Sequence, residues 1–160
     1  MNLIGEILGE ICKTIFPINE EVFFGNRKSS IAVCTLSSIS LLREIKNSEL
    51  MNKISMVGRL LSENKGIDSL IQSVISNTHL KTIIICGEDV TGHKAGNALV
   101  LLHKNGIDYR GKIIGSSSPD PILLTKPDQV KKFQKQVQII NNIGNSNFQD
   151  IKQTINTIKF

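Results

Sequence analysis

His93 is the side chain whose type and position best suit chemistry. It lies in the segment Cys86–Gly96 (CGEDVTGHKAG), between Gly92 and Gly96, and the segment follows a β-branched run typical of a buried strand. A neutral imidazole there could ligate a metal ion or act as a general base. The structural alternative is a polar residue that starts a helix and bonds only to its neighbours. Residue spacing alone leaves both interpretations open.

The three histidines are too far apart to share one metal ion within a single chain. His79 precedes the expected strand Thr82–Cys86 and His93 follows it, a separation of about 15 Å along a strand. His103 is ten residues further along an expected helix, again about 15 Å away. If His93 binds a metal, the other ligands must therefore come with a cofactor.

Common catalytic and nucleotide-binding motifs are absent from the sequence. Neither G-x-G-x-x-G nor G-x-x-x-x-G-K-[ST] occurs, and there is no G-x-S-x-G elbow. A hydrolase would need a nucleophile from the serines at 116–118, with Glu88 or Asp89 orienting His93. Serines grouped in this way more often form turns.

Apolar runs of strand length alternate with segments of helical periodicity. Strands are expected at Ile31–Leu36, Ile54–Val57, Thr82–Cys86 and Lys112–Ile114, with Val137–Ile140 as a candidate for a fifth. Helices are expected between and after them, at about residues 41–46, 67–75, 93–105, 130–140 and 147–158. This alternation predicts an α/β fold: a Rossmann-like parallel sheet of about five strands with helices on both faces.

Three loops in this scheme leave strands at the carboxyl edge of the sheet, where such folds bind ligands. They are Gly58–Gly66, Gly87–Gly92 and Gly115–Pro121. Each begins with glycine, which permits a tight turn and a close approach of the backbone. His93 directly follows the second loop.

Length and composition indicate one domain, residues 1–160, with an N-terminal helix and lead-in over residues 1–22. That helix is expected because Leu3, Ile4, Ile7, Leu8, Ile11 and Ile15 follow helical spacing, and we expect it to dock on its own domain or on a partner. No signal peptide and no apolar run of about 20 residues is visible, so the chain is expected to be cytoplasmic without a transmembrane segment. Three cysteines without a pairing pattern suit a reducing compartment.

The charge and the aromatic content of the chain indicate which classes of partner it could bind. Only 4% of residues are aromatic and tryptophan is absent, which argues against a base-stacking nucleic-acid surface. The net charge is +5, and residues 126–160 hold six lysines against two aspartates. This excess is either a solvated helix face or a patch for an acidic partner or anionic lipid.

Several motifs together resemble the A subunit of the tetrahydromethanopterin–coenzyme M methyltransferase (tetrahydromethanopterin S-methyltransferase) of methanogenic archaea. The most specific is C-G-x-x-V-x-G-H-x-x-G within Ile83–Gly96 (IIICGEDVTGHKAG), followed by N-G-I-D. The resemblance covers about residues 23–158 in one register. Its other segments are Phe23–Leu36 (FFGNRKSSIAVCTL), Ser62–Asp68 (SENKGID), Val74–Asn77 (VISN), His103–Asp108 (HKNGID), Ile113–Gly115 (IIG) and Phe133–Ile140 (FQKQVQII).

The resemblance implies a cobamide, the corrinoid of the vitamin B12 type, as cofactor and a role as methyl carrier. In that family the methyl group moves from methyl-tetrahydromethanopterin to cobalt and on to coenzyme M. His93 matches the histidine that is the lower axial ligand of cobalt. The implied partners are methyl-donor and methyl-acceptor methyltransferase subunits, in a complex that exports sodium and is bound to the membrane, and no nucleic acid. The chain would then be one component of a transferase and not catalytically complete alone.

The cofactor would lie between the three loops, with Thr91 and Glu88 as candidates for supporting His93. The expected cofactor-binding residues are Gly58, Glu63, Asn64, Gly66, Gly87, Glu88, Thr91, Gly92, His93, Gly96, Gly115, Ser116, Ser117, Ser118 and Pro121. The corrin ring supplies four nitrogens, so one protein ligand is sufficient, and imidazole suits cobalt.

The sequence also departs from what the resemblance implies. Thr91 stands where the wider class of B12-binding proteins often has an aspartate, and a hydroxyl is a weaker partner for the ligand histidine. The loop Gly115–Pro121 (GSSSPDP) holds fewer small residues than expected, and Arg59–Leu61 differs from a small-residue-and-cysteine pattern. Members of this family usually end in a membrane-spanning helix, so the chain is expected to be either a truncated form or a stand-alone relative. Two other functions stay open: a small-molecule enzyme that uses His93 as general base, and an assembly protein without a cofactor.

Overall fold

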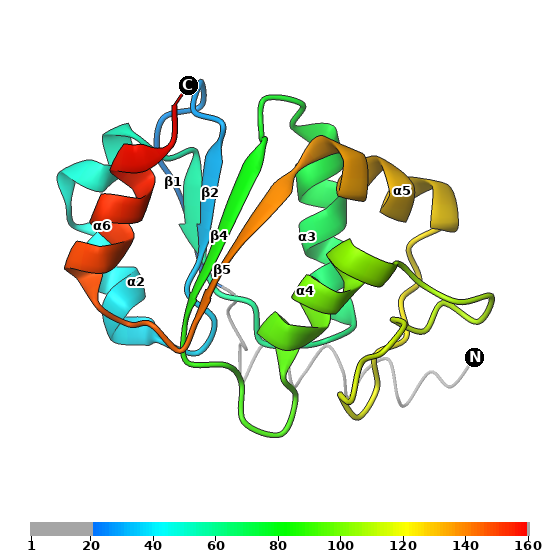
Figure 1. Ribbon diagram of the computed structural model, residues 1–160. Helices are drawn as coiled ribbons and strands as arrows, with labels where there is room; N and C mark the ends of the chain where they lie inside the picture. Colours follow the sequence, from blue (N-terminus) through cyan, green and yellow to red (C-terminus); the bar gives the residue numbers. More distant parts are fainter. Residues whose placement is uncertain (1–20, 160) are drawn as a thin grey trace, which may run out of the picture.

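The computed structural model describes residues 21–159, and a sheet of five strands forms their centre (Figure 1). The strand order is β1-β3-β2-β4-β5. The strands are β1 (Val22–Phe24), β2 (Ile31–Cys34), β3 (Met56–Gly58), β4 (Thr82–Gly87) and β5 (Gln138–Ile143). Strands β2 to β5 are parallel to their neighbours, whereas the edge strand β1 pairs with β3 in the antiparallel direction.

Helices cover both faces of the sheet, so the predicted α/β fold is confirmed (Figure 1). One face carries α3 (Lys65–Ser76), α4 (Ala95–Asn105) and α5 (Pro127–Gln136), and the other carries α2 (Ile39–Lys46), the 3₁₀ helix η1 (Glu49–Asn52) and α6 (Phe148–Thr157). All six residues of β4 are buried, as expected for a β-branched strand covered on both faces. Its alternate side chains enter the two halves of the core: Ile83 and Ile85 face α3 and α4, while Ile84 and Cys86 face α2 and α6.

The prediction of a fourth strand at Lys112–Ile114 is wrong. Lys112–Ile114 forms only isolated bridges, Ile107 with Ile113 and Lys112 with Ile122, outside the sheet. Only Ile113 of this run is buried, so it lacks the apolar surface of a covered strand, and its partners come from the same irregular segment between α4 and α5. The position beside β4 belongs to β5, which begins at Gln138 within the run proposed as a fifth strand.

Two further predictions concern the N-terminal helix and the absence of a transmembrane segment. The N-terminal helix expected over residues 1–22 lies almost wholly outside the described residues, and residues 22–24 form β1. Among residues 21–159, no helix combines the length and the apolar character that crossing a membrane requires.

Candidate functional site

The loop between β4 and α4 places His93. At its start Gly87 has a φ of +78°, and a Cβ there would lie 2.4 Å from the carbonyl oxygen of Thr35, so only glycine fits. At its end the Asp89 carboxylate accepts hydrogen bonds from the backbone N–H of Gly96 (2.8 Å) and Asn97 (2.9 Å). Asp89 thereby satisfies two of the free N–H groups that begin α4. His93 precedes this helix by two residues and is exposed.

His93 and Glu63 form the central contact of the site. The Nδ1 atom of His93 lies 2.9 Å from Oε2 of Glu63, and the exposed fractions of the two side chains are 55% and 2%. A carboxylate can only accept, so Nδ1–H of a neutral imidazole donates and Nε2 keeps its lone pair. Within residues 21–159, Nε2 has no hydrogen-bond partner. The histidine is thus oriented through one nitrogen and free at the other.

A buried network holds Glu63 in place. Its Oε1 atom accepts a hydrogen bond from the backbone N–H of Asp120, at 3.1 Å. Burial alone would raise the pKa of Glu63. Hydrogen bonds from its own backbone and from Asp120, together with His93, outweigh that effect and hold the pKa below its ordinary value. Glu63 is therefore a carboxylate at neutral pH and a strong acceptor for the imidazole.

The three loops expected to form the site do lie together. The Asn64 side-chain amide donates to the carbonyl oxygen (3.2 Å) and to Oδ2 (3.0 Å) of Asp120, which joins the loop Gly58–Gly66 to the loop Gly115–Pro121. Lys94 joins the third loop to the same segment, because its Nζ donates to Ser117 and its carbonyl oxygen accepts from Ser118, both at 3.4 Å. Gly115–Pro121 reaches this place although no strand of the sheet directly precedes it.

An open hollow of about 610 Å³ adjoins these loops. Polar side chains from α4, the loops and β5 line most of it. The lining residues are Asp89, Lys94, Asn97, Ser117, Asn141 and Ile143.

The other predicted site residues are scattered around the loops. Glu88 and Thr91 lie on the surface, and neither makes a hydrogen bond to His93 in the described part of the chain. A Cβ on Gly58 would face Val22 of β1, which is away from the imidazole. Gly96 packs against Leu36, and a Cβ there would lie 2.7 Å from a Leu36 methyl group.

The remaining residues predicted to bind the cofactor lie in the three loops and at the start of α3, and none of them is hydrogen-bonded to His93 in the described part of the chain. Gly66 lies in the first turn of α3, and Pro121 is buried and accepts a backbone hydrogen bond from Ile113. The Gly92 Cβ position is open, and that of Gly115 is near the Asn105 amide. The Ser116 hydroxyl accepts from the backbone of Ser118.

Sequence reasoning missed the parts that Glu63, Asp89 and Asp120 play. Glu63 was expected at the cofactor, but its pairing with His93, thirty residues away, has no local signature. Asp89 lies five residues before Lys94, the N-cap position of α4, so the usual signal of a capping residue immediately before a helix does not indicate it. Among the described residues, no group of three or more His, Cys, Asp and Glu side chains could hold a metal ion.

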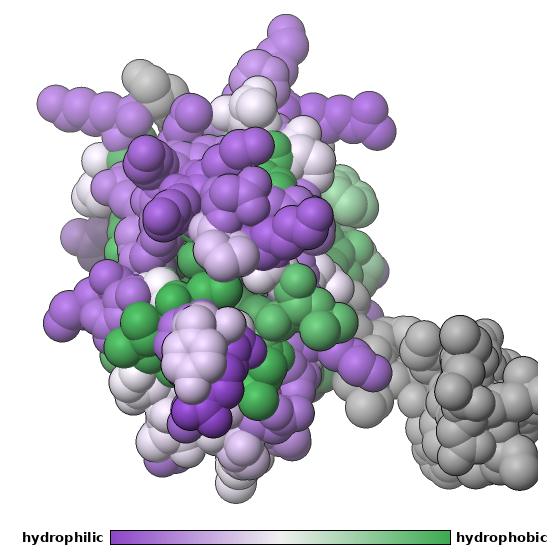
Figure 2. Space-filling view, turned by 90° about the vertical axis from the view of Figure 1, so that its right-hand side faces the viewer, coloured by the Kyte–Doolittle hydropathy of each residue, from purple (hydrophilic) through white to green (hydrophobic). Residues whose placement is uncertain are grey.

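Exposed apolar side chains gather near the same loops. Figure 2 shows hydrophobic residues grouped within a largely hydrophilic face. The exposed large hydrophobic residues of the segment that joins α4 to α5 are Tyr109, Ile114, Ile122 and Leu124, of which Tyr109 and Leu124 are each 89% exposed. An apolar group of this kind on a surface often marks contact with another molecule.

Comparison with known proteins matches the chain to one family. The family model for the A subunit of tetrahydromethanopterin S-methyltransferase matches residues 12–159. Similar proteins include one of Methanosarcina barkeri, provisionally named as the A component of a methyltransferase Mtx (36% identical), and the A subunit of tetrahydromethanopterin S-methyltransferase of Methanosphaera stadtmanae (37%). A third relative, the first of two A-type subunits of that enzyme in Methanothermobacter thermautotrophicus, is 31% identical. The matches cover 82% to 86% of this chain but only 51% to 65% of the relatives' own lengths. The chain belongs to the family formed by the A subunits of tetrahydromethanopterin S-methyltransferase.

Proposed function

We propose that this chain is a cobamide-binding methyl carrier, with His93 as the lower axial ligand of cobalt. The observation that carries the proposal is the His93–Glu63 pair: an exposed imidazole held through Nδ1 by a buried carboxylate, within the region that matches the family. The activity is that of one component in a methyltransferase, working with other subunits.

The donor set around His93 fits such a cofactor. The described residues place no group of three or more metal-ligating side chains at the imidazole, and a corrin ring needs none because it supplies four nitrogens itself. Imidazole nitrogen is a suitable ligand for cobalt, and Nε2 of His93 is the nitrogen left free to bind it. When bound, the cofactor supplies a metal centre that can take up and release a methyl group.

Glu63 positions His93. A metal-binding histidine commonly donates its other N–H to a carboxylate, which fixes the tautomer and makes the ligand nitrogen more basic. Glu63 meets this description at 2.9 Å, and the backbone N–H of Asp120 fixes Glu63 in turn. The threonine at position 91 is therefore no weakness of the site, since the carboxylate comes from another loop.

The loops around His93 would provide the walls of the cofactor site. Lys94 and Ser117 border the open hollow beside these loops, and Asn64 ties the two flanking loops together. We place the methyl-donor and methyl-acceptor subunits on this side, because the exposed apolar segment between α4 and α5 continues from the same loops. The substrates in this proposal are methyl-tetrahydromethanopterin as donor and coenzyme M as acceptor.

The test is an EPR spectrum of the full chain loaded with a cobamide in its cobalt(II) form. We expect nitrogen hyperfine splitting that changes when histidine is labelled with nitrogen-15, and that disappears in His93→Ala. His79→Ala and His103→Ala are the matched controls and should keep the splitting. A splitting that ignores the label, or one that survives His93→Ala, would rule out His93 as the ligand.

The same experiment separates the other two functions. A chain that uses His93 as a general base, or an assembly protein without a cofactor, would leave the spectrum of the free cobamide unchanged. Either result would overturn the proposal even if the chain still joined a methyltransferase complex.

A further inference from the structure

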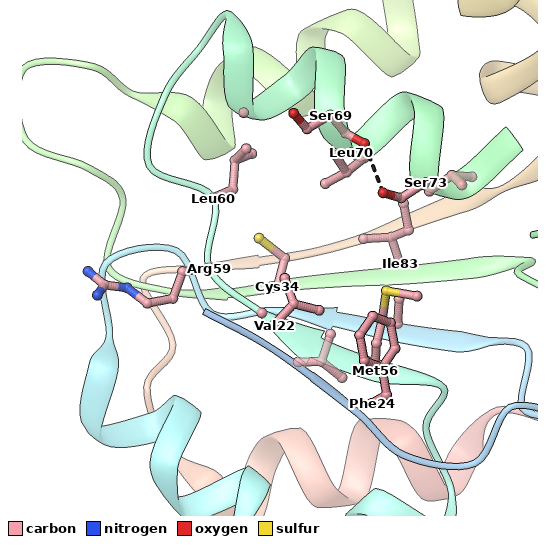
Figure 3. Close-up of a pocket in the computed structure, with 15 residues that line it drawn as sticks. Val22, Phe24, Cys34, Met56, Arg59, Leu60, Ser69, Leu70, Ser73 and Ile83 are labelled. Carbon is pink, nitrogen blue, oxygen red and sulfur yellow. Dashed lines mark hydrogen bonds between the residues drawn. The ribbon is translucent and has the colours of Figure 1, made fainter. Parts of the chain in front are cut away.

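An apolar groove lies between β1 and α3, and His93 is not among the residues that line it (Figure 3). It has a volume of about 200 Å³, and its walls come from β1, β2, β3, β4, α3 and the start of the loop between β3 and α3. Phe24, Met56 and Leu70 border it in Figure 3, from β1, β3 and α3 respectively. The groove is therefore a gap in the helix layer that covers this face of the sheet.

The two faces of β1 differ in how they are covered. On the α2 side, Phe23 packs against the core cluster and has the ammonium group of Lys46 over its ring, 3.9 Å from the centroid. On the α3 side, Val22 is 43% and Phe24 71% exposed. Side chains alternate along a strand, so Val22 and Phe24 present a second apolar face to the α3 side. Among residues 21–159, nothing covers Phe24.

The chain itself offers a segment of matching character directly before β1. Residues 1–20 precede the strand, and their Ile and Leu residues recur at helical spacing on one side, with Glu6 and Lys13 on the opposite side. The apolar stripe from Leu3 to Ile15 would be about 18 Å long as a helix, which is about the length of the twelve-residue helix α3.

The connection to β1 is long enough for this segment to fold back. Seven steps separate Ile15 from Val22, which span at most about 25 Å when extended. Pro17 lies in this connection, where it would end a helix and let the chain turn towards the strand. The segment can thus reach the groove without strain on β1.

We propose that residues 3–15 of this chain form an amphipathic helix that packs its apolar stripe into the groove between β1 and α3. The docked helix completes the layer on the α3 face and covers Val22 and Phe24. The docking needs no bound cofactor. Neither His93 nor Glu63 lines the groove, although Gly58 and Gly66, at the two ends of the loop that holds Glu63, do.

The test uses a single tryptophan in a chain that has none. In the full chain with Phe24→Trp, we expect blue-shifted emission and weak quenching by acrylamide. Adding Ile7→Asp and Ile11→Asp should shift the emission to the red and increase quenching severalfold. The matched control is Asn2→Asp with Lys13→Gln, which makes the same charge change on the opposite side of the helix and should leave the tryptophan covered.

Three results would overturn the proposal. One is a tryptophan that is already fully quenched in the full chain, and another is protection that Ile7→Asp and Ile11→Asp leave intact. The third is protection that depends on protein concentration, which would assign the groove to a second copy of the chain.

A second measurement guards against a Phe24→Trp variant that fails to fold. Ser73 lines the groove from α3, Cys34 lies buried at the base of the same groove, and Cys86 is buried elsewhere in the core. In a background with Cys12→Ser and Cys34→Ala, Ser73→Cys should react slowly with a thiol reagent. The two aspartates in the apolar stripe should accelerate that reaction severalfold and the control pair should not; equal rates in all three would refute the docking.

Discussion

A histidine lies at each end of helix α4, and the two histidines differ in exposure and in their hydrogen-bond partners. At the amino end, His93 is exposed and bonded through Nδ1 to buried Glu63. At the carboxyl end, the Nε2–H of half-buried His103 donates to the carbonyl oxygen of Val137 at 2.7 Å. The His103 ring also meets Phe133 edge to face, with the centroids 6.0 Å apart and the planes at 87°.

The difference lies in which nitrogen is used and what surrounds the ring. His103 uses Nε2 to bind the backbone between α5 and β5 and packs against an aromatic ring, so it ties α4 to the next elements. His93 uses Nδ1 to bind a carboxylate that is itself held, and Nε2 stays free. Spacing along the sequence cannot separate these two roles, whereas the hydrogen-bond partners do.

The largest effect that would sharpen this comparison is on cofactor affinity. We expect Glu63→Gln to weaken cobamide binding about 10- to 100-fold, because it removes the carboxylate that orients His93. Spectroscopic titration of the full chain measures this affinity. Glu44→Gln makes the same charge change on the exposed surface of α2, on the other face of the sheet, and it should bind normally. Equal losses in both variants would mean that Glu63 acts only through net charge.

The next largest effect is on the free energy of unfolding, and here His103 should matter more than His93. We expect His103→Ala to lower the free energy of unfolding by about 2 kcal/mol, from the lost hydrogen bond and the aromatic contact. His93→Ala should cost less than about 1 kcal/mol, because the side chain is 55% exposed and its partner keeps the Asp120 hydrogen bond. Urea denaturation of both variants measures the difference. A larger loss for His93→Ala would reverse the assignment of roles.

Much of the fold could be predicted from the sequence, because buried strands have a distinctive composition. The run Thr82–Cys86 lies within a strand that is buried at every position, and the helix that follows it ends at Gly106 as expected. The prediction for Lys112–Ile114 failed because three residues with one buried side chain do not determine a strand. The edge strand β1 was missed for a related reason, since it is only three residues long.

The candidate site could be predicted only in outline. The three loops and His93 follow from strand ends and glycine positions, and the structure brings those loops together. The Glu63 partner could not be foreseen, because it depends on how the loop before α3 packs beside the loop before α4. Long-range side-chain pairs of this kind arise from tertiary packing and leave no periodic trace in the sequence.

A third effect concerns what fixes the amino end of α4. Asp89→Ala should lower the free energy of unfolding by about 1–2 kcal/mol, because two N–H groups of the helix lose their acceptor. Asp89→Asn should recover part of this loss, since the amide oxygen still accepts but carries no charge. Asp128→Ala is the control: it removes a carboxylate from the first turn of α5, and should cost less than about 1 kcal/mol. Thermal and urea unfolding would compare the three variants, and equal costs would show that Asp89 contributes charge alone.

The smallest effect lies just beyond the His103 end, in the turn that Asp108 forms. Its Oδ1 atom accepts hydrogen bonds from the backbone N–H of Lys112 (3.0 Å) and of Arg110 (2.8 Å), and these bonds hold the pKa of that carboxyl below its ordinary value of 3.8. Because the carboxyl pKa is lower in the folded chain than in the unfolded chain, the ionised carboxylate stabilises the turn at pH values above the ordinary pKa. This contribution is lost as the pH falls through the pKa of the folded chain. We therefore expect the amide resonances of Arg110 and Lys112 to move together in an NMR titration, with a midpoint below pH 3.8. Asp108→Asn should abolish that transition and leave the resonances of His93 and Glu63 unchanged, because Asp108 makes no hydrogen bond to either residue. A titration midpoint at or above pH 3.8 would show that the Asp108 carboxylate does not order this turn. The segment between α4 and α5 would then be held near the site only by the hydrogen bonds around Asp120, such as that to Glu63.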